Sequence, residues 1–328
     1  MTTAKKIWGF NAWREMIRSR PEQQFLVNHF VPEEAAILIS GQAKKGFKSW
    51  FAFQVVICVV TGKPVSMLQP NGAHPVLFLE EEGPSRSAEH RFTMLETGSQ
   101  ISLGDSNKFY WSHRQGWLID DESEIRYLEA YVKDKGIKLV VIDTLAKSSR
   151  MDENNAALTG EVLRKLDRLR NAGASVMFLH HIRKTSKDAS EDVDEEVRGS
   201  SAIPGYYDVH LAFRRRSDSQ KHLDLTVVSR DADEKRYIVS WLIEQATQSA
   251  QLGMRELGLE TVSEDLIADV VQKLLPGNKY TWKQLQESCQ IRKQTAFVEL
   301  VKELEERGIL TKSGDKYVFN TPQEVDHE

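Results

Sequence analysis

Short apolar runs alternate with longer amphipathic segments from residue 36 onward, in lengths typical of regular secondary structure. The strand candidates are residues 36–39, 75–79, 138–143 and 175–179. The helix candidates are residues 49–61, 87–96 and 157–172. Apolar strands that alternate with helices predict a parallel α/β sheet with right-handed crossovers. Two later runs, 208–214 and 223–229, alternate apolar and polar residues and predict an antiparallel extension of that sheet.

The first residues of the chain follow a different pattern. Trp8, Phe10, Trp13 and Ile17 recur at roughly helical spacing, which predicts a short amphipathic segment ahead of the sheet. We expect its aromatic side chains to pack on the main domain.

A third pattern begins after residue 245. Its helix candidates are residues 264–275, 282–289 and 293–307. Two strand-like runs follow at 309–310 and 316–319, with a turn at 313–315 between them. Three helices and a two-stranded ribbon are typical of a winged helix, a variant of helix-turn-helix.

These changes divide the chain into five segments. We predict an N-terminal lead-in or oligomerisation segment at 1–30, an α/β domain at 31–245, a linker at 246–262, a winged-helix domain at 263–320 and a tail at 321–328. Residues 184–196 are polar and mostly acidic, and they are expected to form a solvated loop.

Composition narrows the function classes only a little. The 328 residues carry a formal net charge of −4, so a nucleic-acid partner has to be held by a local basic patch. Only two cysteines occur, Cys58 and Cys289, too few for a disulfide framework or a Cys-rich metal site. The chain lacks an apolar run of about 18 residues and a signal-peptide core, so we expect a cytoplasmic protein without a membrane partner.

The first predicted strand runs into a glycine loop that reads GQAKKGFKSW, residues 41–50. It resembles the phosphate-binding pattern G-x-x-x-x-G-K-[ST], except that Phe47 stands between Gly46 and Lys48. Between a buried strand and a helix, backbone N–H groups and the positive helix end converge on a phosphate. Lys48 can then reach the β- and γ-phosphates of ATP, and the Ser49 hydroxyl can ligate Mg²⁺.

A nucleotide site also needs an acidic group at the tip of a neighbouring strand, to hold the metal ion through water. Asp143 ends the run LVVID and supplies that group. Taken alone, Gly41 and Gly46 are explained equally well by a simple turn, and Asp143 by the cap of a strand end. Their order, with each at the carboxyl end of a strand, predicts a nucleotide site.

Five segments in order carry a family resemblance: ILISGQAKKGFKSW, VLFLEEEGP, LVVIDTL, MFLHHIRK and VRGSSAIPGYYD. Over about residues 25–240 the chain resembles the RecA-like ATPases of the plasmid RepA replicative-helicase type, which are related to DnaB. The resemblance implies a RecA-like P-loop NTPase core with a mainly parallel central sheet, ATP and Mg²⁺ as cofactors, and a homohexamer that acts on single-stranded DNA.

The resemblance also implies the nucleotide contacts. They are Gly41, Lys45, Gly46, Phe47, Lys48, Ser49, Trp50 and His181. Some family members carry phenylalanine before the lysine and serine, as Phe47 does here. One extra residue lies between Gly41 and Phe47, which leaves open which backbone amides meet which phosphate.

Two further roles follow from the same resemblance. Glu82 matches the glutamate that polarises the attacking water, although a one-residue slip would substitute Glu80 or Glu81. His181 matches a polar sensor of the γ-phosphate; a zinc site at His180–His181 is the alternative, but adjacent residues of a strand point to opposite faces.

Arg230 lies in a position that resembles the arginine finger a subunit inserts into its neighbour's ATP site. Arg214, Arg215 and Arg216 are rival fingers. A surface ion pair with Asp231, Asp233 or Glu234 is the structural alternative.

The predicted nucleic-acid contacts fall into two groups. Lys147, Arg150, Lys184 and Arg198 lie on loops that follow central strands, where cations can track single-stranded DNA, although the acidic residues between 188 and 196 oppose this. Arg292 and Lys293 begin the predicted recognition helix of the winged helix, whose ligand can be DNA or a protein.

The resulting hypothesis is an ATP-dependent homohexameric motor on single-stranded DNA, a replicative helicase of a plasmid, phage or integrated mobile element, with a replication initiator or loader as a further partner. A RecA-like ATPase switch or recombination mediator that does not unwind DNA is the alternative. In a third interpretation the winged helix makes the chain a DNA-bound regulator.

Overall fold

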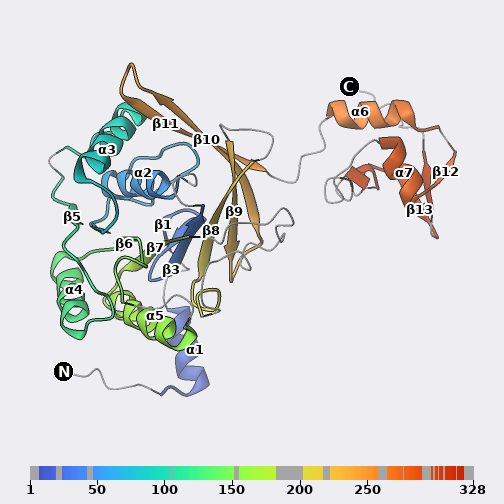
Figure 1. The fold of residues 1–328 in the computed structure, drawn as a ribbon. Coiled ribbons are helices and arrows are strands. Elements are labelled where there is room, and N and C mark those ends of the chain that lie inside the picture. Colours follow the sequence, from blue (N-terminus) through green and yellow to red (C-terminus); the bar gives the residue numbers. More distant parts are fainter. Residues whose placement is uncertain are drawn as a thin grey trace. The chain divides into compact units, whose positions relative to one another are not determined.

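A computed structural model of the chain describes most of its residues (Figure 1). The described residues are 7–19, 24–42, 47–104, 106–150, 155–181, 202–216, 222–257, 264–275, 277–289, 297, 300–301, 303–305, 307–314 and 316–320. The predicted site residues Lys45, Gly46, Lys184, Arg198, Arg292 and Lys293 lie outside them. The chain forms two units, Met1–Glu256 and Leu257–Glu328, which are described separately.

A nine-stranded sheet in the order β11-β10-β9-β8-β3-β7-β6-β4-β5 forms the centre of the first unit. The strands are β3 (Ala36–Gly41), β4 (Val76–Glu80), β5 (Phe109–His113), β6 (Leu139–Asp143), β7 (Ser175–His181), β8 (Val209–Arg215), β9 (His222–Ser229), β10 (Lys235–Glu244) and β11 (Ser249–Leu257). The six strands from β8 to β5 run parallel, whereas β9 and β10 are antiparallel. The predicted mainly parallel α/β fold is confirmed.

Helices cover both faces of the parallel strands (Figure 1). One apolar core lies under α2 (Lys48–Thr61) and α3 (Ser85–Ser99), and another under α4 (Glu122–Lys135) and α5 (Ala156–Asn171). Helix α2 is apolar around most of its circumference because it is buried on nearly all sides. It ends at Gly62, whose φ of 68° lies in the left-handed region that favours glycine.

The antiparallel extension differs from the prediction in where it begins. Strand β8 was predicted to belong to it, but β8 pairs in parallel with β3, and the antiparallel part starts at β9. The predicted linker at 246–262 is wrong in its first half, because β11 occupies Ser249–Leu257 and the first unit extends to Glu256. Ala250 and Leu252 of β11 are buried against the α2 core, which explains why this segment is a strand.

The N-terminal segment also departs from expectation. Helix α1 (Phe10–Arg18) forms, but the aromatic side chains of this segment are not buried in the core: Trp8, Phe10 and Trp13 are 48%, 62% and 44% exposed. The core instead begins with the hairpin β1 (Phe25–Val27) and β2 (Val31–Pro32), where Leu26 and Val27 are fully buried. The α/β unit therefore starts before the predicted boundary at residue 31.

The second unit has its own apolar core, which includes Val270, Leu285, Phe297, Leu304 and Phe319. It contains α6 (Glu264–Lys273), β12 (Lys279–Thr281), α7 (Trp282–Cys289), β13 (Leu310–Ser313) and β14 (Lys316–Phe319), with a sheet in the order β12-β14-β13. Strand β12 was not predicted. Positions 297, 300–301 and 303–305 of the third predicted helix are helical, and the rest of that segment lies outside the described residues. Among the described helices, none is long and apolar enough to cross a membrane.

Candidate nucleotide site

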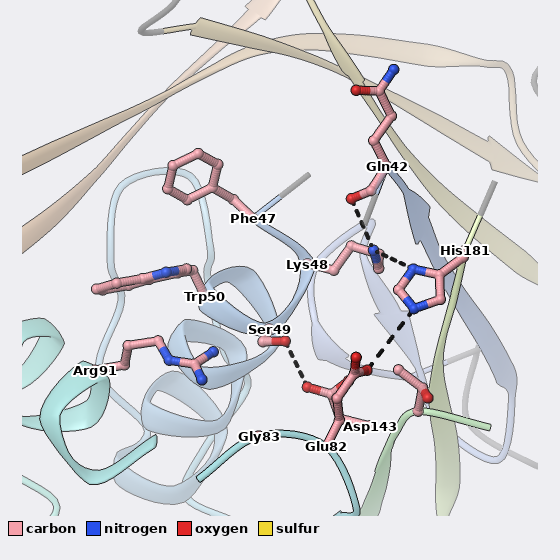
Figure 2. Close-up of a pocket in the computed structure, with 11 residues that line it drawn as sticks. Gln42, Phe47, Lys48, Ser49, Trp50, Glu82, Gly83, Arg91, Asp143 and His181 are labelled. Carbon is pink, nitrogen blue, oxygen red and sulfur yellow. Dashed lines mark hydrogen bonds and ion pairs between the residues drawn. The ribbon is translucent and has the colours of Figure 1, made fainter. Parts of the chain in front are cut away.

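The carboxyl ends of β3, β4, β6 and β7 meet at one edge of the sheet, and a cavity of about 260 Å³ opens there (Figure 2). Its lining residues are Gln42, Phe47, Lys48, Ser49, Trp50, Glu82, Gly83, Arg91, Asp143, Thr144 and His181. Seven residues predicted from the sequence are thus brought together. They are Phe47, Lys48, Ser49, Trp50, Glu82, Asp143 and His181.

Lys48 is the first residue of α2 and is only 6% exposed. Its Nζ donates to the carbonyls of Gly41 at 3.0 Å and Gln42 at 3.2 Å, and lies 3.3 Å from Nδ1 of His181. Burial lowers the pKa of the ammonium, while the charges of Asp143 and Glu82 oppose that shift. No carboxylate among the described residues forms an ion pair with Lys48, so its charge is available to an anionic ligand at the helix N-terminus.

Gly41, which ends β3, is required by close packing. A Cβ on Gly41 would lie 3.1 Å from the carbonyl oxygen of Phe213 and 3.2 Å from its Cβ, because β8 passes beside the start of the loop. A side chain at this position would require β3 or β8 to shift by a few tenths of an ångström.

Phe47 is the residue at which the loop departs from the usual phosphate-binding pattern. Its φ of 51° lies in the left-handed region, which costs a residue with a side chain on the order of 1–2 kcal/mol. The ring stacks on Trp241 of β10, with centroids 6.1 Å apart and planes 15° apart, and Trp50 lies 5.8 Å from the same indole. Stacking on an aromatic cluster therefore offsets the strain that glycine would avoid.

Ser49 and Asp143 form the acidic part of the cavity. The Ser49 hydroxyl donates to Oδ2 of Asp143 at 2.6 Å. Burial raises the pKa of Asp143 to about 6, the hydrogen bond from Ser49 opposes the shift, and the charges of Glu82 and Glu80 add to it. A divalent cation would relieve this excess of negative charge.

The donor set also fits Mg²⁺, which prefers hard oxygen ligands and keeps several waters. The Ser49 hydroxyl would ligate it directly and Asp143 through water. Bound there, Mg²⁺ would neutralise negative charge on the phosphate groups of a nucleotide.

The three adjacent glutamates have different surroundings. Oε2 of Glu80 lies 3.0 Å from Nδ1 of His113, and burial raises the pKa of this carboxyl. Glu81 accepts backbone N–H bonds from Gly116 at 3.0 Å and Trp117 at 3.3 Å. Of the three, Glu82 alone lines the cavity. This geometry favours Glu82 over its neighbours for a role beside the ligand.

His181 lies between the lysine and the glutamate. Its Nδ1 faces Nζ of Lys48, and its Nε2 is 3.9 Å from Oε2 of Glu82 (Figure 2). The preceding His180 is 1% exposed, and its side chain is not among the cavity lining. In the part of the chain that the structure describes, no group of three His, Cys, Asp or Glu side chains is arranged to hold a metal ion.

Arg91 and Trp241 belong to this region but were not predicted. Arg91 of α3 lines the cavity, and its Nε donates to the carbonyl of Ser87 at 3.0 Å. Its guanidinium carbon also lies 5.3 Å from the ring centroid of Phe53. No local motif surrounds either residue; they reach the site only through the packing of α3 and β10.

Arg230 lies far from the cavity of its own chain. Its backbone N–H donates to Asp208, which bonds Ala36 at the beginning of β3, whereas the glycine loop follows the end of β3. Ala36 and Gly41 are five residues apart along β3, which corresponds to roughly 16 Å. The Arg230 side chain is 53% exposed and donates to the carbonyls of Tyr207 and Gly205. It therefore makes no contact with its own Lys48.

The rival fingers lie at the other end of β8. Arg214 and Arg215 are the last two residues of β8. They lie at the same edge of the sheet as the cavity but do not line the cavity. Arg216 forms an ion pair of 2.7 Å with Asp224.

The predicted DNA contacts are only partly within the described residues. Lys147 is exposed on the loop after β6. Arg150 is held by Asp120 at 3.1 Å and Asp121 at 3.3 Å, so its charge is already compensated. The described part of these loops does not by itself create a strongly basic surface.

The raised pKa of Asp143 predicts a stability that depends on pH. Between pH 3.8, its ordinary pKa, and about 6, the folded state holds a proton that the unfolded state has lost. The free energy of unfolding therefore falls as pH rises through this range, by on the order of 3 kcal/mol from this group. We expect Asp143→Asn to raise the stability of the metal-free protein at pH 7 and to flatten its pH dependence, while Mg²⁺–nucleotide binding is lost.

Urea unfolding between pH 4 and 7 in EDTA measures this effect. Ser49→Ala is the comparison variant. It keeps the carboxylate and removes the hydrogen bond that opposes the shift, so its stability should fall with rising pH at least as steeply as that of the wild type. An Asp143→Asn variant that is less stable than the wild type at pH 7 would contradict the assignment.

Comparisons with known proteins agree with this geometry. Residues 10–187 match a protein family described as an AAA domain. The fold is similar to that of a DnaB-like replicative helicase whose structure was solved for its interactions with primase, with a TM-score of 0.55 and 13% identity over 73% of this chain and 66% of that one. The match thus spans just under two thirds of that helicase, and at this identity it shows a common P-loop NTPase fold. No curated protein sequence matches the chain. Because the family match covers more than half of its residues, the chain belongs to the AAA domain family.

Proposed function

We propose that the chain is an ATP-dependent motor on single-stranded DNA that works as a homohexamer, a replicative helicase of the plasmid RepA type from a plasmid, phage or integrated mobile element. The observation that carries the proposal is the convergence of Lys48, Ser49, Glu82 and Asp143 on one cavity at the carboxyl edge of the sheet. The similarity of the fold to a DnaB-like replicative helicase supports it.

The side chains divide the chemistry between them. Lys48 stabilises the charge on the departing γ-phosphoryl group, while Ser49 and Asp143 would hold Mg²⁺. Glu82 accepts a proton from the attacking water as the water oxygen forms a bond to the γ-phosphorus. The bond from that phosphorus to the β–γ bridging oxygen breaks, and ADP leaves. His181, between Lys48 and Glu82, is placed to respond to the presence of the γ-phosphate.

Glu82→Gln is expected to keep ATP binding and to lower the hydrolysis rate by about 10²–10⁴-fold, because the amide has the same shape but cannot accept the proton. Filter binding of ATP and phosphate release measure the two effects separately. Glu81→Gln is the matched control, since that carboxylate binds the backbone of Gly116 and Trp117. If Glu81→Gln loses hydrolysis and Glu82→Gln does not, the assignment is one residue out of register.

Assembly completes the site in this proposal. Arg230 is too far from its own cavity to act there, so its role as a finger requires a neighbouring subunit. The exposed aromatic residues of α1 offer an apolar surface for such contacts between copies. The second unit, as a winged helix, is proposed to bind an initiator or loader protein or DNA.

A second function is an ATPase switch or recombination mediator that does not unwind DNA. It is favoured by the ion pairs of Arg150, which leave one predicted DNA contact compensated. A forked duplex with a single-stranded tail distinguishes the two functions. The helicase proposal expects ATP-dependent strand displacement, which Lys48→Ala loses. ATP hydrolysis without displacement on either tail polarity, in a protein that binds the fork, would favour the switch.

A further inference from the structure

A buried polar chain crosses β3 and β8 on the face of the sheet covered by α5. Oγ of Ser40 is 2.7 Å from Nε2 of His210, and Nδ1 of His210 is 3.3 Å from the hydroxyl of Tyr207. Ser40, His210 and Tyr207 are 1%, 0% and 5% exposed. Their neighbours in this core, such as Leu38 and Phe178, are apolar. The nucleotide chemistry described above uses none of the three side chains.

The two ends of this chain lie beside two different functional elements. Ser40 directly precedes Gly41, whose carbonyl accepts a hydrogen bond from Lys48. At the other end, the carbonyl of Tyr207 accepts a hydrogen bond of 2.9 Å from Nε of Arg230. A continuous set of contacts therefore joins the strand that carries the glycine loop to the proposed finger.

The chemistry of histidine makes this connection specific. A neutral imidazole donates from one ring nitrogen and accepts at the other, so each of the two hydroxyls has a defined role toward it. In an apolar core, removing one partner costs a hydrogen bond that solvent does not replace, and it lets the neighbouring side chain shift. The ring of His210 thus determines where the Tyr207 side chain lies.

The Tyr207 backbone in turn sets the direction of Arg230. The guanidinium donates to the carbonyls of Gly205 at 2.7 Å and Tyr207, two fixed acceptors on the same turn. That turn is anchored at its end by Asp208, whose carboxylate accepts from Arg170 and from the backbone of Ala36. Arg230 is exposed, but the acceptors that orient it are not free to move independently of β3.

We propose that His210 is a positioning residue. Through Tyr207 it orients Arg230, and through Ser40 it ties that orientation to the strand that carries the glycine loop of the same chain. The inference rests on the proposed function, in which Arg230 acts on the ATP of the neighbouring subunit. In each subunit, the orientation of Arg230 then depends on the position of that subunit's own glycine loop.

Tyr207→Phe tests the proposal because it removes one hydroxyl and keeps the ring. We expect kcat for ATP to fall by about tenfold, the equivalent of one hydrogen bond, with KM unchanged. The melting temperature should fall by a few degrees, because a buried hydrogen bond is lost. Tyr237→Phe is the matched control: Tyr237 is equally buried but lies in the core under α2, and its variant should keep the wild-type kcat.

Placing the substitution in one kind of subunit separates positioning from a general structural effect. Lys48→Ala subunits supply only fingers and Arg230→Ala subunits supply only sites, so mixed rings of the two should recover activity. Tyr207→Phe should reduce that activity by about tenfold when it is in the Lys48→Ala subunit and leave it unchanged in the Arg230→Ala subunit. Ser40→Ala should follow the same rule, although Ser40 lies next to its own glycine loop.

The possible outcomes are distinct. Equal losses from either placement, or no loss from either, would overturn the positioning role of His210 while the proposed function stands. If the mixed rings without Tyr207→Phe fail to recover activity although the subunits assemble together, the finger assignment itself is wrong, and the inference is overturned with it.

Discussion

Replacing Lys48 by alanine is expected to lower ATP turnover by at least about 10²–10³-fold, because a preorganised cation at the γ-phosphate acts on charge that develops in the transition state. The fold should persist. Lys48 is a buried cation whose pKa is already lowered, so its removal also removes a desolvation cost. Its hydrogen-bond acceptors are the carbonyls of Gly41 and of Gln42, and Gln42 lines the cavity.

Steady-state phosphate release and circular dichroism measure the two halves of this prediction. Lys108→Ala is the matched control, since Nζ of Lys108 also donates to a backbone carbonyl, that of Ala73 at 2.9 Å, but away from the cavity. Wild-type turnover in a correctly folded Lys48→Ala protein would show that the glycine loop is not part of the nucleotide site.

Replacing Arg230 by alanine is expected to lower turnover by on the order of 10³-fold or more, the contribution of an arginine finger supplied by a neighbour. If Arg230 were only a surface residue that holds the carbonyls of Gly205 and Tyr207, its loss would cost little activity. Arg230 makes no contact with its own cavity, so any large effect on hydrolysis has to be exerted between subunits or through the fold.

Mixed rings decide between these explanations. Neither Lys48→Ala nor Arg230→Ala alone should hydrolyse ATP, but rings that contain both should recover part of the activity, because some boundaries pair an intact Lys48 with an intact Arg230. Arg216→Ala is the control for a rival cation, since Arg216 is already paired with Asp224. Full activity of Arg230→Ala alone, or inactive rings that demonstrably contain both variants, would contradict the assignment.

Much of the central sheet could be predicted from the sequence because its strands are buried on both faces. Runs such as LVVID contain no polar residue before the proposed functional one. The same run therefore predicts both the strand and the position of a site residue. The same holds for β3 and the glycine loop. The family resemblance favours Glu82, but the run of three glutamates leaves Glu80 and Glu81 open. The register of a strand end depends on which carboxylates the backbone and His113 engage.

Other elements escaped prediction for identifiable reasons. Strand β5 is short, and all five of its residues are half-buried, so it shows no alternation. Helix α4 did carry a signal that was overlooked: the Asp121 side chain caps its first turn, Gly136 ends it, and Ile125, Leu128 and Val132 form its buried face. The sequence predicts a linker where β11 lies, because the burial of this strand depends on contacts with a core formed by residues far away in sequence.

The exposed aromatic side chains of α1 illustrate a further limit. Helical spacing of Trp8, Phe10 and Trp13 predicts an apolar face, but periodicity does not say what covers that face. Arg91 and Trp241 show the converse case. Nothing in their sequence neighbourhood indicates a site, and only packing brings them beside Phe47 and the cavity.

The most direct test of the central claim is the ATP turnover of the full-length protein, measured with and without Mg²⁺ and with and without single-stranded DNA. If the cavity is the nucleotide site of a DNA motor, hydrolysis requires Mg²⁺, increases when single-stranded DNA is added, and disappears in Glu82→Gln. Turnover that is indifferent to Mg²⁺ and to Glu82→Gln, or a protein that binds ATP but does not respond to DNA, would contradict it.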